Sequence, residues 1–394
     1  MTFTSKRGGP TDSKLPQLDR FLEQDPTNAG LLHEALSAAM SEGHFDRAEG
    51  YLSRAKALGV DAAQWALNAV HLAMARSEWP KAQELLNALA ATGNIPPALA
   101  TTLAHDQAVI DFMQGRDAQA LAALQPLLEQ EASSDWRMPT ATQVLLLRVW
   151  HRALAFEPAM PWARTHAETG AFDAAALGVA SLLALDAGDF ESSERWARSA
   201  LESGQANAEA LVAASALALM EHDAESAERF ARLALQRNDR ESRSWASLGM
   251  ARFAQQDIVE ANDCLARSVD ASPTHATTML LLGWTEFLLQ RVEDAARTFA
   301  RAIDLDRGFA ECHGALAVAQ AQLGLVDDAN VSLDRALRLD RDCASAQFAK
   351  MLLEGNGPLE GAEVRRLGRR LLEHRVSPAG VPLSRWLPDD DSQA

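Results

Sequence analysis

The chain repeats its own sequence at a spacing of 34 residues. Residues Asp189 to Leu201 read DFESSERWARSAL and residues Asp223 to Leu235 read DAESAERFARLAL, so nine of the thirteen positions are identical. A fixed period of about 20 to 50 residues is the signature of an array of stacked supersecondary units. An array also suits a chain of 394 residues, because a single compact core stops growing at about 250 to 300 residues. We therefore expect a repeat protein.

The composition predicts that each repeated unit is helical. Hydrophobic residues make up 47% of the chain but aromatic residues only 6%, with a single tyrosine. The sequence is dominated by Ala, Leu, Arg and Glu, whose side chains lose little freedom in a helix, and the usual strand residues are sparse. We expect an all-α fold.

The unit from Ser242 to His275 carries large and small side chains at fixed positions. At positions 4, 7, 8, 20, 24 and 32 it has Trp245, Leu248, Gly249, Ala261, Leu265 and Pro273. This pattern resembles the tetratricopeptide repeat, and the next unit continues it with Leu282, Gly283, Ala295 and Phe299. The resemblance implies a helix-turn-helix unit in which the small residues let two helices approach and the large residues fill the space between units. Position 11, usually Tyr in the family, departs from the pattern at Arg252, Glu286 and Gln320.

The resemblance implies a right-handed superhelical solenoid of about nine such repeats with capping helices. Prolines and short insertions set the expected divisions of the chain. We expect a disordered leader at 1–14, an N-terminal capping helix at 15–28, repeats one to three at 29–134, an irregular fourth repeat at 135–173, repeats five to nine at 174–343, C-terminal capping helices at 344–374 and a tail at 375–394.

The charge balance argues against nucleic acid as a partner. The chain has 54 acidic and 37 basic residues, a formal charge of −17, and the repeats gather no basic face that would attract a phosphate backbone. One basic segment, Arg365 to Arg370, has two interpretations. In the first, it binds an acidic partner, a nucleic acid or a membrane surface. In the second, it lies at the C-terminal end of a closing helix with an apolar stripe of Val364, Leu367 and Leu371, where the helix dipole favours arginines.

Cysteine use and hydropathy favour the cytoplasm. Cys264, Cys312 and Cys343 are too few and too far apart for a disulfide framework, which fits buried thiols in a reducing compartment. The first residues lack the apolar run of a secretory signal, and no stretch of about 18 apolar residues predicts membrane insertion. The preference for Arg over Lys, with abundant Ala, suggests a bacterial source.

A search for catalytic and metal-binding motifs finds none. The ten histidines form no HExxH motif and no metal-type spacing with cysteine, and the chain lacks a GxSxG elbow and a phosphate-binding glycine loop. Enzymes that carry this repeat append a catalytic domain, and only about 40 residues follow the region of resemblance, which ends near residue 354. We expect no enzyme activity, no metal, no cofactor and no small-molecule substrate.

The family resemblance implies that the first helix of each unit lines a concave groove, with positions 2, 5, 9, 12 and 13 facing inward. Carried onto this chain, these positions predict an apolar partner-binding strip of Leu219, Met220, Met250, Phe253, Trp284, Phe287 and Leu288. Large flexible and aromatic side chains suit a recognition surface. The neighbouring Leu182, Leu185, Val212 and Leu280 either join this strip or, as we favour for all but Leu185, pack within the superhelix.

The basic residues of the carboxylate clamp, by which some family members hold a chaperone C-terminus, are missing, since position 5 is Val212, Ala246, Leu280 and Gly314. The leading hypothesis is a scaffold, adaptor or chaperone that binds an apolar or amphipathic segment of another protein, in a bacterial secretion or envelope-assembly apparatus by family analogy. The alternative is a regulatory subunit that binds a folded enzyme through its convex or C-terminal surfaces. Occupation of the groove by the chain's own tail, around Val381 to Leu387, stays open.

Overall fold

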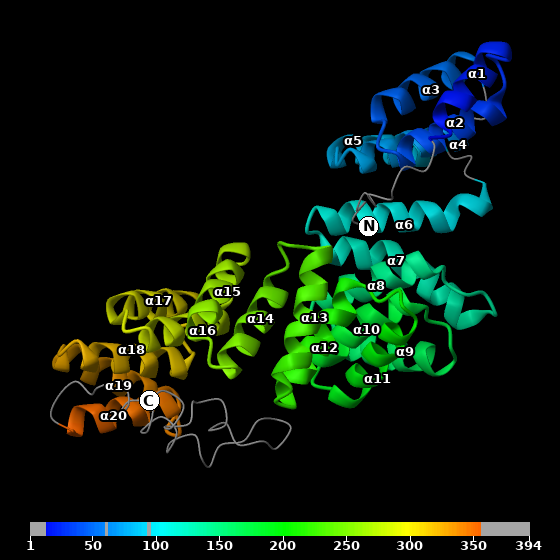
Figure 1. The fold of residues 1–394 in the computed structure, drawn as a ribbon. Coiled ribbons are helices and arrows are strands. Elements are labelled where there is room, and N and C mark those ends of the chain that lie inside the picture. The colour runs from blue at the N-terminus through cyan, green and yellow to red at the C-terminus, as the bar shows by residue number, and fades with distance from the viewer. Residues whose placement is uncertain (1–12, 60–61, 93–95, 356–394) are drawn as a thin grey trace. The chain divides into compact units, whose positions relative to one another are not determined.

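The computed structural model describes residues 13–59, 62–92 and 96–355, and in these ranges the regular structure is entirely helical (Figure 1). The chain divides into two compact units, residues 1–161 and 162–394. The leader, the basic segment Arg365 to Arg370 and the tail around Trp386 lie outside the described residues, except for Ser13 and Lys14.

The first unit holds a single helix followed by helical pairs. The helices are α1 (Leu15–Gln24), α2 (Ala29–Ser41), α3 (Phe45–Ala57), α4 (Ala62–Ala75), α5 (Trp79–Ala91), α6 (Pro97–Met113), α7 (Asp117–Ser133) and α8 (Thr140–Arg152). The next helix, α9 (Phe156–Glu168), contains the boundary between the units, directly after Pro161.

The second unit continues the same alternation. Its helices are α10 (Ala174–Asp186), α11 (Phe190–Glu202), α12 (Ala208–Met220), α13 (Ala224–Arg237), α14 (Ser242–Ala254), α15 (Ile258–Ala271), α16 (Ala276–Leu288), α17 (Val292–Leu305), α18 (Ala310–Gln322), α19 (Val326–Leu339) and α20 (Ala344–Glu354). In the described residues the chain therefore has nine helical pairs, from α2 and α3 to α18 and α19. The expected all-α fold of paired helices is confirmed.

Each pair turns on one residue in the left-handed region of backbone conformation. Gly188 supplies it between α10 and α11 with φ 79°, and Gly324 between α18 and α19 with φ 74°. His222, Gln256 and Gln290 occupy the same place in the three turns between them, with φ from 61° to 68°. Because glycine has no Cβ, it adopts this conformation without the steric cost that other residues carry.

The second helix of several pairs begins with an aspartate cap. The side chains of Asp189, Asp223 and Asp257 accept hydrogen bonds from the amides of Ser192, Ser226 and Glu260 at 3.2, 2.9 and 3.1 Å. Such a cap satisfies an amide that the first turn of a helix leaves without an internal partner. The repeated Asp in the 34-residue motif is therefore a helix start.

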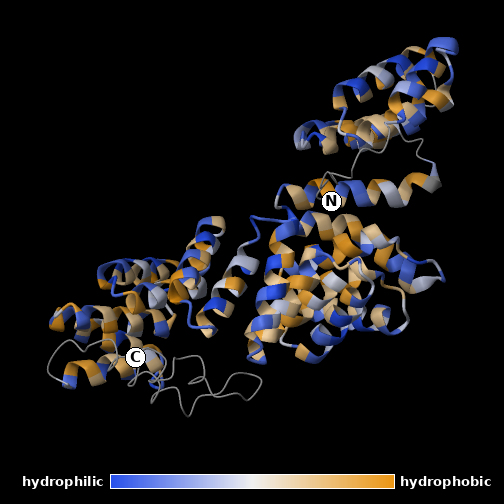
Figure 2. Ribbon diagram, viewed as in Figure 1, coloured by the Kyte–Doolittle hydropathy of each residue, from blue (hydrophilic) through white to orange (hydrophobic). Residues whose placement is uncertain are grey.

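The two helices of a pair differ in how they are buried. In α10 every residue from Gly178 to Leu185 is buried, whereas α11 buries one side only and exposes its arginines and glutamates (Figure 2). A helix that is apolar on all sides needs neighbours on all sides, and an amphipathic helix needs them on one. The first helices therefore form the interior of the second unit.

Small residues at position 8 let the helices of a pair pack closely. A Cβ on Gly249 would lie 2.8 Å from Cγ of Leu265, and one on Gly283 would lie 2.4 Å from Cε1 of Phe299. The large residue at position 24 thus occupies the space that the glycine of its own unit leaves. The sequence pattern was expected to place this residue between units, and the structure differs at this point.

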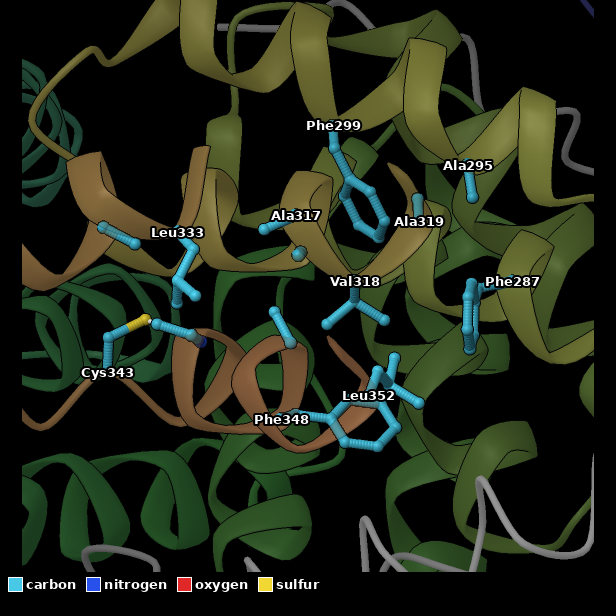
Figure 3. Close-up of a cluster of buried hydrophobic side chains, with 14 of the residues drawn as sticks. Phe287, Ala295, Phe299, Ala317, Val318, Ala319, Leu333, Cys343, Phe348 and Leu352 are labelled. Carbon is cyan, nitrogen blue, oxygen red and sulfur yellow. Dashed lines mark hydrogen bonds between the residues drawn. The ribbon is translucent and has the colours of Figure 1, made fainter. Parts of the chain in front are cut away.

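The helix α20 packs as the first helix of a further pair. Glu311 of α18 accepts hydrogen bonds from the amides of Ala344 and Ser345 at 2.9 and 3.1 Å, and from the Ser345 hydroxyl. Gly314 permits the close approach, since a Cβ there would lie 2.5 Å from the amide nitrogen of Ala346. Phe348 and Leu352 then join a core with Phe287, Phe299 and Val318 (Figure 3).

Candidate functional site: the inner layer of the second unit

The first helices of the second unit form an inner layer. The helix α12 contacts α10 and α14, and α18 contacts α16 and α20, whereas no second helix makes comparable backbone contacts with another second helix in the described residues. Helices that approach each other most closely lie on the inside of a curved stack. The residues of the predicted binding strip belong to the helices of this inner layer.

At the start of this layer the predicted apolar positions are used for internal packing. Leu182 and Leu185 of α10 are 7% and 9% exposed, and Val212 of α12 is 2% exposed. They form one cluster with Leu211 and Ala213. The interpretation that Leu182 and Val212 pack within the structure agrees with this burial, and Leu185 belongs with them.

Phe287 corrects the predicted site. Its side chain is 3% exposed and belongs to the core formed with α17, α18 and α20 (Figure 3), so it does not project freely beside Phe253. Phe287 is buried through long-range packing, because its core includes Phe348 and Leu352 of α20, a helix two pairs later in the chain. A buried ring stabilises the stack and offers no surface to a partner.

Trp284 has a mixed position. It is half-buried and packs against the same core, with ring centroids 5.8 Å from Phe287, 5.5 Å from Phe299 and 6.3 Å from Phe348. The contact with Phe348 joins α16 to α20. Trp284 therefore serves first as an internal bridge, and only part of its surface is accessible.

The other five predicted residues remain partly accessible. Leu219 and Met220 end α12, Met250 and Phe253 lie on α14 and Leu288 ends α16, and each is half-buried. We call these five residues the inner strip. Large apolar side chains that are neither buried nor fully exposed retain area for contact with another molecule.

The inner layer is least closed where the inner strip lies. Arg243 of α14 forms a two-bonded ion pair with Asp186 of α10, at 2.6 and 2.7 Å, and Trp284 joins α16 to α20. The backbones of α14 and α16, in contrast, make at most marginal contact in the described residues, although both pack on α15. The separation of these two first helices explains why Met250 and Phe253 are not covered by a neighbour.

Charged residues fix the pair α14 and α15 against α13. Arg252 pairs with Glu228 of α13 and, at 3.1 Å, with Glu260 of α15, and Arg232 pairs with the same two glutamates. Burial raises the pKa of Glu228, but hydrogen bonds from Arg232 and Gln255 and the charge of Arg252 outweigh it and leave the pKa below its ordinary value. Arg at position 11, an unusual residue for the family, is thus part of an ion-pair network between pairs.

Trp245 also departs from its expected place. The sequence pattern places it between units, but the ring is half-buried, its Nε1 donates to the carbonyl of Asp239 at 2.8 Å, and the Arg267 guanidinium lies 4.7 Å from the ring centroid. The ring covers the edge of the small cluster around Leu248. Trp245 therefore lies at the edge of this cluster and not between two units.

Sequence reasoning did not find a row of polar contacts in the first unit. His33 of α2 meets Asn68 of α4 at 3.4 Å, and His71 of α4 meets the buried Asp106 of α6 at 2.7 Å. His105 of α6 meets Thr142 of α8 at 3.1 Å. These contacts could have been predicted from the spacing of the polar residues, which lie about one repeat apart in first helices that are otherwise apolar.

The described residues contain no cluster of three or more histidine, cysteine or acidic side chains able to hold a metal ion. Cys264, Cys312 and Cys343 are buried free thiols, and burial raises their pKa to about 11, 12 and 12. Neutral buried thiols are poor nucleophiles. Within the described residues no helix is both long and apolar enough to cross a membrane.

No protein-family model matches the chain, and no curated protein does. Solved structures do resemble it. YrrB, described as a TPR protein with an unusual peptide-binding site, is 20% identical over 48% of this chain and 96% of that chain, with a TM-score of 0.39. PilF of Pseudomonas aeruginosa is 19% identical over 50% of this chain and 88% of its own, with a TM-score of 0.41.

A mutant O-GlcNAc transferase from Thermobaculum terrenum is 24% identical over 33% of this chain and 26% of that chain, with a TM-score of 0.32. The identities and TM-scores are low, and the fold statement rests on the helices themselves. They pair at a 34-residue period, turn on one left-handed residue and pack position 8 against position 24. The chain has the tetratricopeptide-repeat fold.

Proposed function

We propose that the chain is a non-enzymatic scaffold, adaptor or chaperone whose inner strip binds an apolar or amphipathic segment of another protein. The observation that carries this proposal is the combination of partly accessible Met250 and Phe253 with the separation of α14 from α16. Methionine adapts to irregular surfaces and aromatic rings supply large contact areas, which are the properties of binding hot spots.

The proposal extends to the setting of the protein. Free buried thiols fit a reducing compartment. The proposed location is the cytoplasm of a bacterium, and the proposal includes no nucleic-acid partner, cofactor or small-molecule substrate. A secretion or envelope-assembly apparatus is the proposed context, by analogy with other proteins of this repeat type.

A second candidate is a regulatory subunit that binds a folded enzyme through its outer or C-terminal surface. It is favoured by exposed aliphatic side chains on second helices, where Val259 of α15 is 61% exposed and Val331 of α19 is 68% exposed. Val259 and Val331 lie on second helices, whereas the inner strip lies on first helices, so the two functions predict different sensitive positions.

The test compares Met250→Ala with Phe253→Ala, and uses the double variant Val259→Ala and Val331→Ala as the matched control. The partner is captured from the native host by the wild-type chain, identified by mass spectrometry and measured by calorimetry. Truncating a hot-spot side chain costs about 2 kcal/mol or more, roughly a thirtyfold loss of affinity. If only the inner-strip variants lose affinity for the partner, the scaffold function is supported. If only the valine double variant loses affinity, the regulatory function is supported and the scaffold function is overturned.

A further inference from the structure

One ion pair in the second unit joins two first helices that are not neighbours in the layer. Arg243, in the first turn of α14, donates two hydrogen bonds to the carboxylate of Asp186, the last residue of α10, at 2.6 and 2.7 Å. The helix α12 lies between these helices and contacts both (Figure 1). Two parallel bonds between a guanidinium and a carboxylate fix the geometry as well as the attraction. The pair therefore holds α10 and α14 together across α12.

Both members of the pair occupy inward positions of the repeat. Asp186 is position 13 of the unit that begins at Ala174, and Arg243 is position 2 of the unit that begins at Ser242. Their side chains are 28% and 36% exposed, so the pair lies at the surface of the inner layer. It thus crosses α12 on the inner side of the second unit.

Inward apolar residues of the helices that the pair joins and crosses are covered. Leu182 and Leu185 of α10 and Val212 of α12 form one buried cluster. Val212, at inward position 5, is 2% exposed, whereas the same position of α14 and of α16, Ala246 and Leu280, is half-buried. Position 5 is therefore closed on α12 and partly open on the next two first helices.

We propose that the Arg243–Asp186 pair is a clasp that keeps the inner face of the second unit closed over α12 and that uncovers the apolar cluster around Val212 when it breaks. Met220 of the inner strip packs on this cluster, so an open clasp extends the accessible apolar surface from the inner strip towards α10. The inference goes beyond the proposed function, because the cluster lies outside the inner strip and the clasp acts whether or not the strip binds a partner.

An ion pair suits a contact that opens, because its strength depends on the solution. A partly exposed pair adds little to stability, so the helices stay folded without it. Salt also screens it, since the screening length falls from about 10 Å at 0.1 M to about 3 Å at 1 M. The bridge from α16 to α20 is apolar instead, with the rings of Trp284 and Phe348 6.3 Å apart. Salt therefore acts on the clasp and not on this second bridge.

Hydroxyl-radical footprinting, read residue by residue by mass spectrometry, measures the exposure of each apolar side chain. The full chain is compared with Arg243→Ala, with Asp186→Ala and with the reversed pair, Asp186→Arg together with Arg243→Asp. Arg164→Ala is the matched control, because Arg164 forms a 2.8 Å ion pair with Asp189 in the same unit. Leu183, which is fully buried in α10, reports any general loosening of the helix.

Each single variant of the clasp is expected to raise the labelling of Leu182, Leu185 and Val212 about two- to fivefold, since labelling follows the open fraction. Leu183 stays protected, the reversed pair restores protection, and Arg164→Ala labels as the wild type does. Sodium chloride at about 1 M raises labelling of the wild type towards that of Arg243→Ala and leaves this variant unchanged.

Three results would overturn the clasp. In the first, both single variants label as the wild type does. In the second, Leu183 gains labelling together with the cluster, so the pair stabilises the helices and does not gate their inner face. In the third, the reversed pair labels as strongly as the single variants. None of these results concerns Met250 and Phe253, so the proposed function is judged separately by its own test.

Discussion

The inner layers of the two units are built from the same repeat by different chemistry. In the first unit neighbouring first helices meet through polar pairs such as His71 with Asp106. In the second unit they meet through buried aliphatic side chains such as Leu182 and Val212. The two groups of a polar pair satisfy each other through a directional hydrogen bond, whereas the burial of apolar surface is non-directional and can be provided by any apolar neighbour. Apolar side chains also join first helices in the first unit, where Val70 and Ile110 share one cluster, so the polar pairs are an addition there.

The largest effect is expected from a substitution in the apolar core of the second unit. Phe299 is fully buried and fills the space over Gly283, so Phe299→Ala is expected to cost about 3 to 5 kcal/mol of unfolding free energy there. Hydrogen–deuterium exchange read peptide by peptide should show faster exchange in α16 to α20 and unchanged exchange in α4 and α6. Equal loss of protection in both units would show that they unfold as one and that the comparison fails.

A smaller effect is expected from the polar row of the first unit. Asp106 is 3% exposed, and its replacement by Ala leaves His71 without its partner, which costs about 1 to 3 kcal/mol. Protection of α4 and α6 should fall while that of α16 stays constant. The isosteric Asp106→Asn retains a hydrogen-bond acceptor and should lose less, and an Asn variant as weak as the Ala variant would point to charge as the decisive property.

The smallest effects are opposite responses of the units to pH. Burial lowers the pKa of His105, so the unfolded chain takes up a proton more readily, and first-unit stability falls as pH drops below about 6.5 by at most about 1.4 kcal/mol per pH unit. Burial raises the pKa of Cys312 and Cys343 from 9.0 to about 12. The unfolded thiols ionise first, so second-unit stability falls as pH rises above 9.0.

Urea unfolding of each unit, followed by exchange at several pH values, measures this difference. His105→Gln should remove the acid sensitivity of the first unit, and Cys312→Ala together with Cys343→Ala should flatten the alkaline slope of the second. Identical pH profiles in the two units would contradict the assignment of these groups.

The sequence predicted local features well because the repeat encodes them locally. The 34-residue period and the small residue at position 8, such as Gly283, belong to positions within one unit of the pattern. The predicted all-α fold is confirmed for the same reason. The Asp caps and the packing of Phe299 on Gly283 within one pair were found only in the structure. The boundary between the two units after Pro161 was not predicted, although the prolines around it marked that repeat as irregular.

Contacts that skip a repeat could not be predicted. The burial of Phe287 depends on Phe348, two pairs away, and Arg243 reaches Asp186 across 57 residues. Periodicity assigns a residue to a face but does not say whether that face is covered by a later helix. For the inner strip this distinction decides which of the predicted residues remain accessible, and their role in binding stays a proposal.

The all-round burial of α10 has a consequence for biosynthesis. A helix without a polar face exposes apolar surface until the next pair packs on it, so newly made α10 waits for about one further repeat to leave the ribosome. The same holds for α12, in which every residue from Ala210 to Ser215 is buried. The nascent chain therefore needs protection while these two helices wait for the pairs that cover them.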